Sequence, residues 1–241
     1  MLEKRTQKLI AVSAVALIAG ISLALTAPAS TTTTLRDAAI QSEPSTPNEA
    51  IKALMDGNKR YLENRSKSEN PPSARPALAA GQAPFAAIVR CADSRVAPEI
   101  VFDQPLGALF VNGVAGNIIT PEIVASFEFS VAVLGSKLIV IMGHSSCGAV
   151  QTAITMRNKT DQLPGSLPML IDQIIVPCTL DANPDDLAAY EEKAIICNAN
   201  KGIQQLIARS PVLAAAVEKG DLKIIAGVQD LKTGTFTVTK K

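Results

Sequence analysis

The chain has no tryptophan, and aromatic residues make up only 3% of its 241 residues. A hydrophobic core must therefore consist largely of Ala, Val, Ile and Leu, and the apolar share of 47% is enough for a large one. An excess of charge of either sign is also missing, since the formal net charge is +1 and the Lys and Arg residues are scattered. This even distribution of charge argues against nucleic acid as the main partner.

Histidine is almost absent: His144 is the only one, beside four cysteines. An even number of Cys suggests disulfides in an exported protein, whereas Cys close to His suggests a metal site. Composition alone leaves both interpretations open, so the spacing of these residues must decide between them.

A long apolar run occurs only at the N-terminus, so no membrane span is expected elsewhere. Residues 1–8 carry an excess of basic side chains, residues 9–25 are uncharged and mostly apolar, and residues 27–29 offer small side chains for cleavage. We predict a signal peptide over residues 1–29, with a retained membrane anchor as the alternative. The Ser-, Thr- and Pro-rich residues 30–46 are then a flexible linker.

Residues 47–241 are predicted to form one domain that begins with a helix. Thr46 to Glu49 has the form of a capping box with Pro47 at the first helical position. The candidate core-facing residues of this helix are Ile51, Leu54, Met55 and Leu62. Three prolines in residues 68–76 predict a loop after it.

Short apolar runs alternate with helical patterns in the rest of the domain. The predicted strands are residues 85–90, 109–114, 137–142 and 222–228, followed by an alternating edge strand at 233–239. The predicted helices are residues 121–134, 148–156, 187–209 and 211–219, and the stretch before residue 187 is less patterned. Continuous apolar strands separated by helices predict an α/β fold: a mostly parallel central sheet covered by helices, with a C-terminal edge strand.

Chemically distinctive residues follow two of these strands. Cys91, Asp93 and Arg95 come after the first predicted strand, and His144 and Cys147 come after the third. Ligands of such sheets collect beyond the carboxyl ends of the strands, so we expect these side chains at one edge. Two thiolates and one imidazole suit Zn²⁺ in tetrahedral geometry, and three protein ligands leave the open position of a catalytic zinc site. Cys147 also lies where a helix should begin, which favours its thiolate form.

Each of these residues has a plainer interpretation. A lone His is commonly structural, a lone Cys is commonly a small core residue, and Asp93 with Arg95 is compatible with an ordinary surface ion pair. A disulfide between Cys91 and Cys147 would leave Asp93, Arg95 and His144 unexplained. The combination at two strand ends favours the metal site.

The other two cysteines, Cys178 and Cys197, have no His beside them. Export favours their oxidation to a disulfide, which would contribute roughly 3 kcal/mol through loop closure. The alternative is two buried thiols.

The segments Cys-x-Asp-x-Arg and His-x-x-Cys resemble the hallmark segments of β-class carbonic anhydrases. The match runs from CADSRVAPEIVFDQPLGALFV through VAGN and SFEFSVAVLGSKLIVIMGHSSCGAV to RSPVL and DLKTG. The resemblance implies the same α/β fold and a homodimer or larger homo-oligomer in which neighbouring subunits complete each active site. It also implies reversible hydration of CO₂ to bicarbonate and a proton.

For the site itself, the resemblance implies that Cys91, His144 and Cys147 are zinc ligands. Zinc lowers the pKa of a bound water towards ~7 and so supplies a hydroxide nucleophile. Asp93 would accept a hydrogen bond from this hydroxide, and Arg95 would pair with Asp93 and hold it off the metal. If the pair breaks, Asp93 becomes a fourth ligand and closes the site. Our hypothesis is that mildly acidic conditions favour this closed form.

The resemblance also implies two substrate contacts and shows two departures. Gln104 would donate a hydrogen bond to bicarbonate, assisted by the backbone N–H of Gly148. Gly113 stands where the family commonly has Arg, and Gln229 stands where it has Tyr. Neither position is a metal ligand, so we expect activity to survive both changes.

Other functions stay open from the sequence. Hydrolysis of carbonyl sulfide or carbon disulfide needs the same zinc hydroxide. A non-catalytic zinc protein with a closed site has no evident need for Arg95, and a thiol redox protein would need a Cys-x-x-Cys pair. The N-terminal pattern and the resemblance predict a periplasmic or secreted protein, without a membrane partner unless the N-terminal segment is retained.

Overall fold

The computed structural model of the chain describes residues 44–179 and 186–241. The predicted signal peptide, residues 1–29, and all but the end of the predicted linker, residues 30–46, lie outside the described residues. In the part of the chain that is described, no helix is both long enough and apolar enough to cross a membrane.

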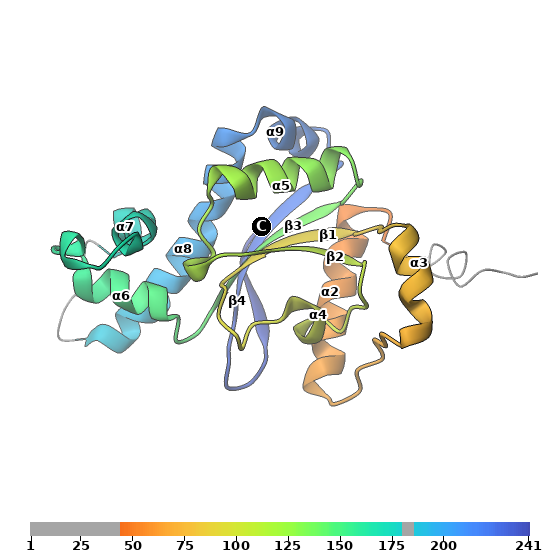
Figure 1. Cartoon of the computed structure of the whole chain (residues 1–241), viewed down its shortest axis with the longest axis horizontal. Coiled ribbons are helices and arrows are strands. Elements are labelled where there is room, and N and C mark those ends of the chain that lie inside the picture. Colours follow the sequence, from red (N-terminus) through yellow and green to blue (C-terminus); the bar gives the residue numbers. More distant parts are fainter. Residues whose placement is uncertain (1–43, 180–185) are drawn as a thin grey trace, which may run out of the picture.

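A five-stranded sheet in the order β2-β1-β3-β4-β5 forms the centre of the domain (Figure 1). Its strands are β1 (Ala86–Arg90), β2 (Leu109–Gly113), β3 (Leu138–His144), β4 (Lys223–Gln229) and β5 (Phe236–Lys240). Strands β1 to β4 are parallel, and β5 is antiparallel to β4. The predicted fold class, with its C-terminal edge strand, is confirmed.

The two central strands are apolar because both of their faces are covered. All residues of β3 are buried, and in β1 only the last residue, Arg90, is partly exposed. Strand β3 extends past its predicted end to His144, because its pairing with β4 continues to the His144–Gln229 pair. Strands β1 and β3 are neighbours, so their carboxyl ends lie side by side at one edge of the sheet.

Helices cover both faces of the sheet (Figure 1). They are α2 (Pro47–Leu62), α3 (Arg75–Ala80), α4 (Pro98–Val101), α5 (Pro121–Ala132), α6 (Gly148–Met156), α7 (Leu167–Cys178), α8 (Leu187–Arg209) and α9 (Pro211–Glu218). One face packs against α2 and α4 through a cluster that includes Leu54 and Phe102. The other packs against α5, α8 and α9 through a cluster that includes Phe127 and Leu206. Burial of these apolar side chains is the main force that stabilises the layers.

Helix α2 begins as predicted. The Thr46 hydroxyl accepts a hydrogen bond from the Glu49 N–H, and the Glu49 carboxylate accepts one from the Thr46 N–H. The prediction that Leu62 faces the core is wrong, because its side chain is 39% exposed. Leu62 ends the helix and lies near Gly234 in the turn between β4 and β5, rather than over the sheet.

The predicted loop over residues 68–76 is partly wrong, because it contains a 3₁₀ turn at Pro72–Ala74 and the start of α3. Proline fits the first turn of a helix, where its missing N–H costs nothing. The prolines therefore start these short helices, whereas α2 has already ended at Leu62.

The sequence does not predict α7, which lies in the less patterned stretch before residue 187. A disulfide joins Cys178, the last residue of α7, to Cys197 on α8. The disulfide interpretation of these cysteines is therefore the correct one. Helices α6, α7 and α8 enclose a third apolar cluster, which includes Cys91 and Cys147.

Candidate metal centre

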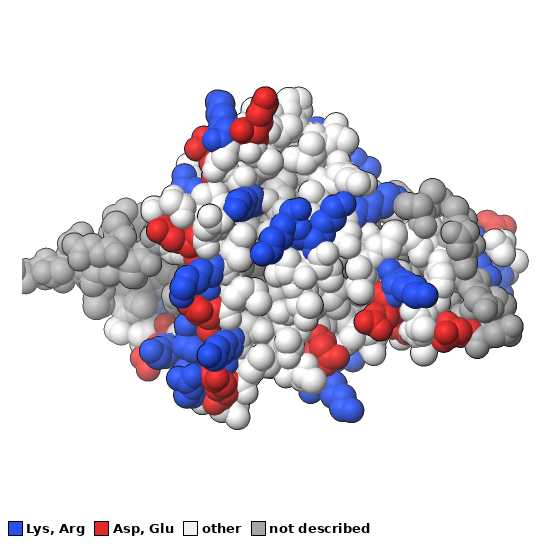
Figure 2. Space-filling model, turned by 180° about the vertical axis from the view of Figure 1, so that it is seen from behind, with Lys and Arg blue, Asp and Glu red and all other residues white. Residues whose placement is uncertain are grey.

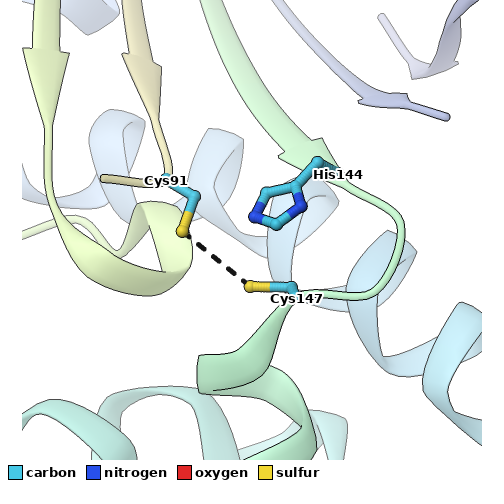
Figure 3. A group of neighbouring side chains, drawn as sticks. All are labelled: Cys91, His144 and Cys147. Atoms are coloured by element: carbon cyan, nitrogen blue, oxygen red, sulfur yellow. Dashed lines mark hydrogen bonds between the residues drawn. The ribbon is translucent and has the colours of Figure 1, made fainter. Parts of the chain in front are cut away.

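Three potential metal ligands come together at the carboxyl edge of the sheet (Figure 3). Cys91 follows β1, His144 is the last residue of β3, and Cys147 is the N-cap of α6. All three are buried, and one ligand atom from each lies within 4.8 Å of the others. The two Sγ atoms are 4.0 Å apart. The order of the strands thus brings together residues that are far apart in the sequence.

The loop between His144 and Cys147 is fixed to the end of β4. The Ser145 N–H donates to the Gln229 carbonyl at 2.8 Å, and the Ser145 hydroxyl accepts from the Leu231 N–H at 2.9 Å. Ser146 takes a left-handed conformation with φ of 54°, which turns the chain sharply between the two ligands. The carbonyl of Gln229, one of the two departures from the family pattern, therefore helps to fix this loop.

The imidazole of His144 presents one nitrogen to the site. Its Nδ1 lies 2.9 Å from the Ser145 carbonyl, to which it can only donate, so Nε2 carries the lone pair. This Nε2 atom is buried and has no hydrogen-bond partner among the residues that the structure describes. Burial lowers the pKa of His144, but the electrostatic effects of Cys91 and of the Ser145 carbonyl outweigh it and raise the pKa above its usual value. An unpaired acceptor beside two thiols is what a metal ligand requires.

The two thiols share a single negative charge readily. A hydrogen bond from Cys147 is the largest cause that lowers the pKa of Cys91 to about 4, and His144 and the Gly116 N–H add to it against the effect of burial. The hydrogen bond with Cys91 and burial raise the pKa of Cys147. A divalent cation would favour both thiolates together.

The start of α6 acts on Cys147 in the predicted direction but does not decide its charge. The N–H groups of Ala149 and Val150 lower the pKa of Cys147, as expected for a helix N-terminus. The effect of the neighbouring Cys91 sulfur is larger, because a second negative charge so close by is unfavourable. The expectation that the helix N-terminus favours the thiolate of Cys147 is therefore confirmed in direction, although Cys91 has the larger effect on its pKa.

Asp93 and Arg95 form a two-pronged ion pair beside the three ligands. Arg95 Nε lies 2.9 Å from Asp93 Oδ1, Arg95 Nη2 lies 2.7 Å from Oδ2, and the Arg95 N–H also donates to Oδ1. Asp93 Oδ2 lies 3.9 Å from His144 Nε2, so the carboxylate is at the edge of the ligand group. The hydrogen bonds from Arg95 are the main cause of a strongly lowered pKa of Asp93. The carboxylate therefore remains ionised and oriented by Arg95.

The two predicted substrate contacts lie in different surroundings. Gly148 is the first residue of α6 and is exposed, and among the described residues only its own chain neighbours and helix backbone lie near the position where a Cβ would be. Gln104 is buried beside α2, and its Nε2 donates to the Phe102 carbonyl at 2.8 Å and lies near Gly57. The contacts of Gln104 within its own chain therefore join it to α2 and not to the ligand group.

Arg90 occupies the space above Gly113. A Cβ added to Gly113 would lie 3.4 Å from Cζ of Arg90, and Arg90 Nη1 donates to the Cys91 carbonyl at 2.7 Å. The guanidinium of Arg90, from β1, therefore lies against Gly113 of β2, the position where the family commonly has Arg. The sequence pattern alone does not reveal this contact, because it depends on the register between the two strands.

Sequence reasoning also missed two residues that support Cys91. The Gly116 N–H donates to Cys91 Sγ at 3.3 Å, and Asn198 Nδ2 donates to the Gly116 carbonyl at 2.7 Å. Gly116 lies in the VAGN segment, which belongs to the recognised motif, but no local signal marks Asn198. Its contact with Gly116 arises from the packing of α8 and spans 82 residues of sequence.

Fold and site together define a class of protein: an α/β protein with a Cys₂His metal-binding group at the carboxyl edge of a parallel sheet. Residues 86–236 match the family model described as carbonic anhydrase. The chain belongs to the β-class carbonic anhydrase family.

Relatives in bacteria match over most of the domain. The chain is 38% identical to "Carbonic anhydrase 2" of Mycobacterium tuberculosis over 189 residues, which are 77% of this chain and 89% of that protein. It is 36% identical to a carbonic anhydrase of Pseudomonas aeruginosa over 165 residues, which are 65% of this chain and 74% of that protein.

Solved structures share the fold at lower identity. One of the tetrameric β-carbonic anhydrases from Sordaria macrospora superposes with a TM-score of 0.61 and 24% identity, covering 85% of this chain and 96% of that chain. A Coccomyxa β-carbonic anhydrase in complex with acetazolamide gives a TM-score of 0.60 and 24% identity, covering 77% and 84%.

Proposed function

We propose that the protein catalyses the reversible hydration of CO₂ to bicarbonate and a proton at a zinc centre held by Cys91, His144 and Cys147. The observation that carries this proposal is the buried Cys₂His group with the Asp93–Arg95 pair at its edge. Membership of a family whose relatives are named carbonic anhydrase supports the reaction. Carbonic anhydrases are lyases, so the protein is a lyase.

The donor set fits zinc better than the other common divalent ions. Two sulfur donors and one imidazole nitrogen are borderline-soft ligands, and three protein ligands leave one position for a small molecule. The unpartnered Nε2 of His144 and the adjacent sulfur atoms supply these donors. When bound, zinc lowers the pKa of a coordinated water to ~7, which makes a nucleophile available at neutral pH.

Asp93 orients the attacking water in this proposal. Its carboxylate, whose Oδ2 lies 3.9 Å from His144 Nε2, would accept a hydrogen bond from the water and so orient it for attack on CO₂. Arg95 keeps both Asp93 oxygens engaged and prevents the carboxylate from turning onto the metal. Loss of the Arg95 contact would let Asp93 become the fourth ligand, which is our hypothesis for an inactive form under mildly acidic conditions.

Gly148 and Gln104 are proposed to contact bicarbonate from different chains. The Gly148 backbone is accessible next to Cys147, as a donor to a substrate oxygen must be. Gln104 lies beside α2, so it would reach a site only across an interface with a neighbouring subunit.

We propose a homodimer or larger homo-oligomer. Strand β2 ends the order of the described sheet, so its outer edge pairs with no other described strand. Large apolar side chains are exposed in the segment that precedes β2, notably Ile100 at 62% and Leu106 at 53%. On α5, Phe129 is also exposed, at 47%. An unpaired edge with exposed apolar side chains is unfavourable in a monomer. Tetrameric relatives from Sordaria macrospora support this proposal.

We also propose that the protein is exported to the periplasm or secreted after removal of residues 1–29. The basic and apolar pattern at the N-terminus motivates the proposal, and the Cys178–Cys197 disulfide supports it, because such bonds persist in oxidising compartments. Fractionation of cells that express the full chain, with N-terminal sequencing of the product, tests it. An uncleaved protein in the cytoplasm would contradict it.

The proposed activity is tested by stopped-flow CO₂ hydration, with zinc content measured in the same samples. The wild type should contain one zinc per chain and turn over CO₂, and Cys147→Ser should lose both. Ser146→Gly is the matched control, because it changes the same loop and suits the left-handed conformation at that position. Bound zinc without turnover of CO₂ would contradict the proposal.

Carbonyl sulfide and carbon disulfide are the alternative substrates, since they need the same nucleophile. Initial rates with all three substrates on one preparation distinguish them. A higher specificity for either sulfur compound than for CO₂ would overturn the proposed substrate, whereas zinc without turnover of any of them would indicate a non-catalytic zinc protein.

A further inference from the structure

Gly116 is held in place from both sides of its Cα atom. On one side its N–H donates to Cys91 Sγ at 3.3 Å, and on the other its carbonyl accepts from Asn198 Nδ2 at 2.7 Å. Glycine rotates freely about φ and ψ, and here it adopts a φ of 73°, in the left-handed region. A glycine in this conformation needs external contacts to keep its N–H pointed at one acceptor. The Asn198 hydrogen bond is such a contact.

Side chains from two further helices enclose Gly116. A Cβ at this position would lie 2.6 Å from Ile174 Cδ1 on α7 and 3.2 Å from Ala149 Cβ on α6. A larger residue would require the Ile174 side chain to move and would press against Ala149 in the first turn of α6, which starts immediately after Cys147. Gly116 therefore links Cys91 to three helices through close contacts.

The disulfide lies next to Asn198 in the sequence. Cys197 immediately precedes Asn198 on α8, and its partner Cys178 ends α7, the helix that carries Ile174. The disulfide thus holds together α7 and α8, two of the three helices that contact Gly116. Asn198 is also buried, at 8% exposure, so solvent cannot readily replace its hydrogen bond.

We propose that Asn198 is a positioning residue for the metal ligand Cys91, acting through the Gly116 backbone. The inference rests on the zinc centre of the proposed function. Asn198 fixes the conformation of Gly116, and the Gly116 N–H then holds the Cys91 sulfur in the direction of His144 and Cys147. Hydrogen bonds that orient a ligand in this way slow the loss of the metal. Asn198 does not contact the reacting atoms and changes only how Cys91 is held.

The test is the rate of zinc release to an excess of a chromogenic chelator. Asn198→Leu keeps approximately the volume of the side chain and removes its donor, and Asn198→Ala removes the side chain. Both variants should release zinc roughly tenfold or more faster than the wild type, since loss of the hydrogen-bond partners that orient metal ligands typically costs about 10- to 100-fold in metal affinity. Two replacements of different size keep the test decisive if one of them packs poorly. A second readout is the thiolate-to-metal charge-transfer band of the cobalt-substituted protein, which should shift in both variants.

Asn58→Ala is the matched control. Asn58 is also a buried asparagine, and its amide binds the carbonyls of Val101 and Gly234 on the opposite face of the sheet. This variant should lower the melting temperature of the metal-free protein at least as much as Asn198→Ala, yet release zinc at the wild-type rate.

Three outcomes would overturn the positioning role or the function on which it rests. Zinc release at the wild-type rate in both Asn198 variants would overturn the positioning role. Equally rapid release from Asn58→Ala would also overturn it, because general destabilisation would then explain the effect. A wild type that binds zinc but does not hydrate CO₂ would overturn only the proposed activity, since zinc release is measured without turnover.

Discussion

At the scale of single residues, the position of Asp93 depends on Arg95. Both carboxylate oxygens of Asp93 are engaged by the guanidinium, and the side chain of Arg95 remains 56% exposed while Asp93 is 18% exposed. An exposed ion pair contributes little to stability. The main role of the ion pair is therefore to orient the Asp93 carboxylate and not to stabilise the fold.

Removal of the guanidinium should affect turnover and leave folding nearly unchanged. We expect Arg95→Ala to reduce CO₂ hydration roughly 10- to 100-fold with zinc content retained, because Asp93 loses its orientation. Arg65→Ala is a matched control, since Arg65 pairs with Glu63 over the same two-residue spacing. Stopped-flow rates and zinc analysis of both variants check the prediction, and equal rates for Arg95→Ala and Arg65→Ala would contradict it.

The charge of Asp103 has a structural role. Its buried carboxylate accepts hydrogen bonds from Arg60 and from the N–H groups of Lys67 and Ser68. Burial raises the pKa of Asp103, but these hydrogen bonds outweigh it, and the pKa in the folded protein lies below its usual value. The carboxylate anchors the segment after α2 to the end of α4.

The stability of the protein should therefore depend on pH through Asp103. Because the folded pKa lies below the unfolded value of ~3.9, the carboxylate stabilises the fold fully above about pH 4 and loses this effect as the pH falls through the folded pKa. Asp103→Asn should cost roughly 1–3 kcal/mol at pH 7 and progressively less below pH 4. Urea unfolding across this pH range measures the difference. A difference that grows towards acid pH would contradict the prediction.

At the scale of elements, the sequence predicts regular strands and helices well and their long-range contacts poorly. Strands β1 and β3 are predictable because burial on both faces requires continuous apolar runs, and α2 because its capping box is local. Helix α7 is not predicted because a proline near each of its ends obscures its helical pattern in the sequence. The three potential ligands are predictable from their positions at strand ends, whereas the contact of Asn198 with Gly116 is created only by packing.

The disulfide between α7 and α8 should stabilise the fold. Loop closure by a bond such as Cys178–Cys197 contributes about 3 kcal/mol. We therefore expect the double variant Cys178→Ala, Cys197→Ala to lose about that much free energy of unfolding, measured by urea denaturation of the zinc-loaded protein. Treatment of the wild type with a phosphine reductant should give a similar loss. A change of only a few tenths of a kcal/mol would show that packing alone holds α7.

At the scale of the whole molecule, the surface has no single dominant charge. On the face drawn in Figure 2, acidic and basic side chains occur together along the rim, and a short row of Lys and Arg crosses an otherwise uncharged area. The formal net charge of +1 agrees with this mixture. Broad uncharged areas are available for contact with a second copy, in keeping with the proposed assembly.

The assembly is testable by light scattering coupled to size-exclusion chromatography. We expect a mass of at least two chains at micromolar concentration, because the outer edge of β2 and nearby apolar side chains would otherwise remain exposed to water. Phe129→Asp should shift the protein towards a monomer and reduce turnover, if a neighbouring subunit supplies Gln104. A fully active monomer would contradict both the assembly and the role of Gln104.

The central claim, that CO₂ hydration depends on a zinc ion held by Cys91, His144 and Cys147, is tested most directly by zinc titration. Zinc is added in steps to the metal-free protein, and CO₂ hydration is measured after each addition. We expect the rate to rise linearly and to stop rising at one zinc per chain, and we expect no such rise for Cys91→Ser. Turnover that does not depend on zinc, or saturation with zinc without turnover, would contradict the central claim.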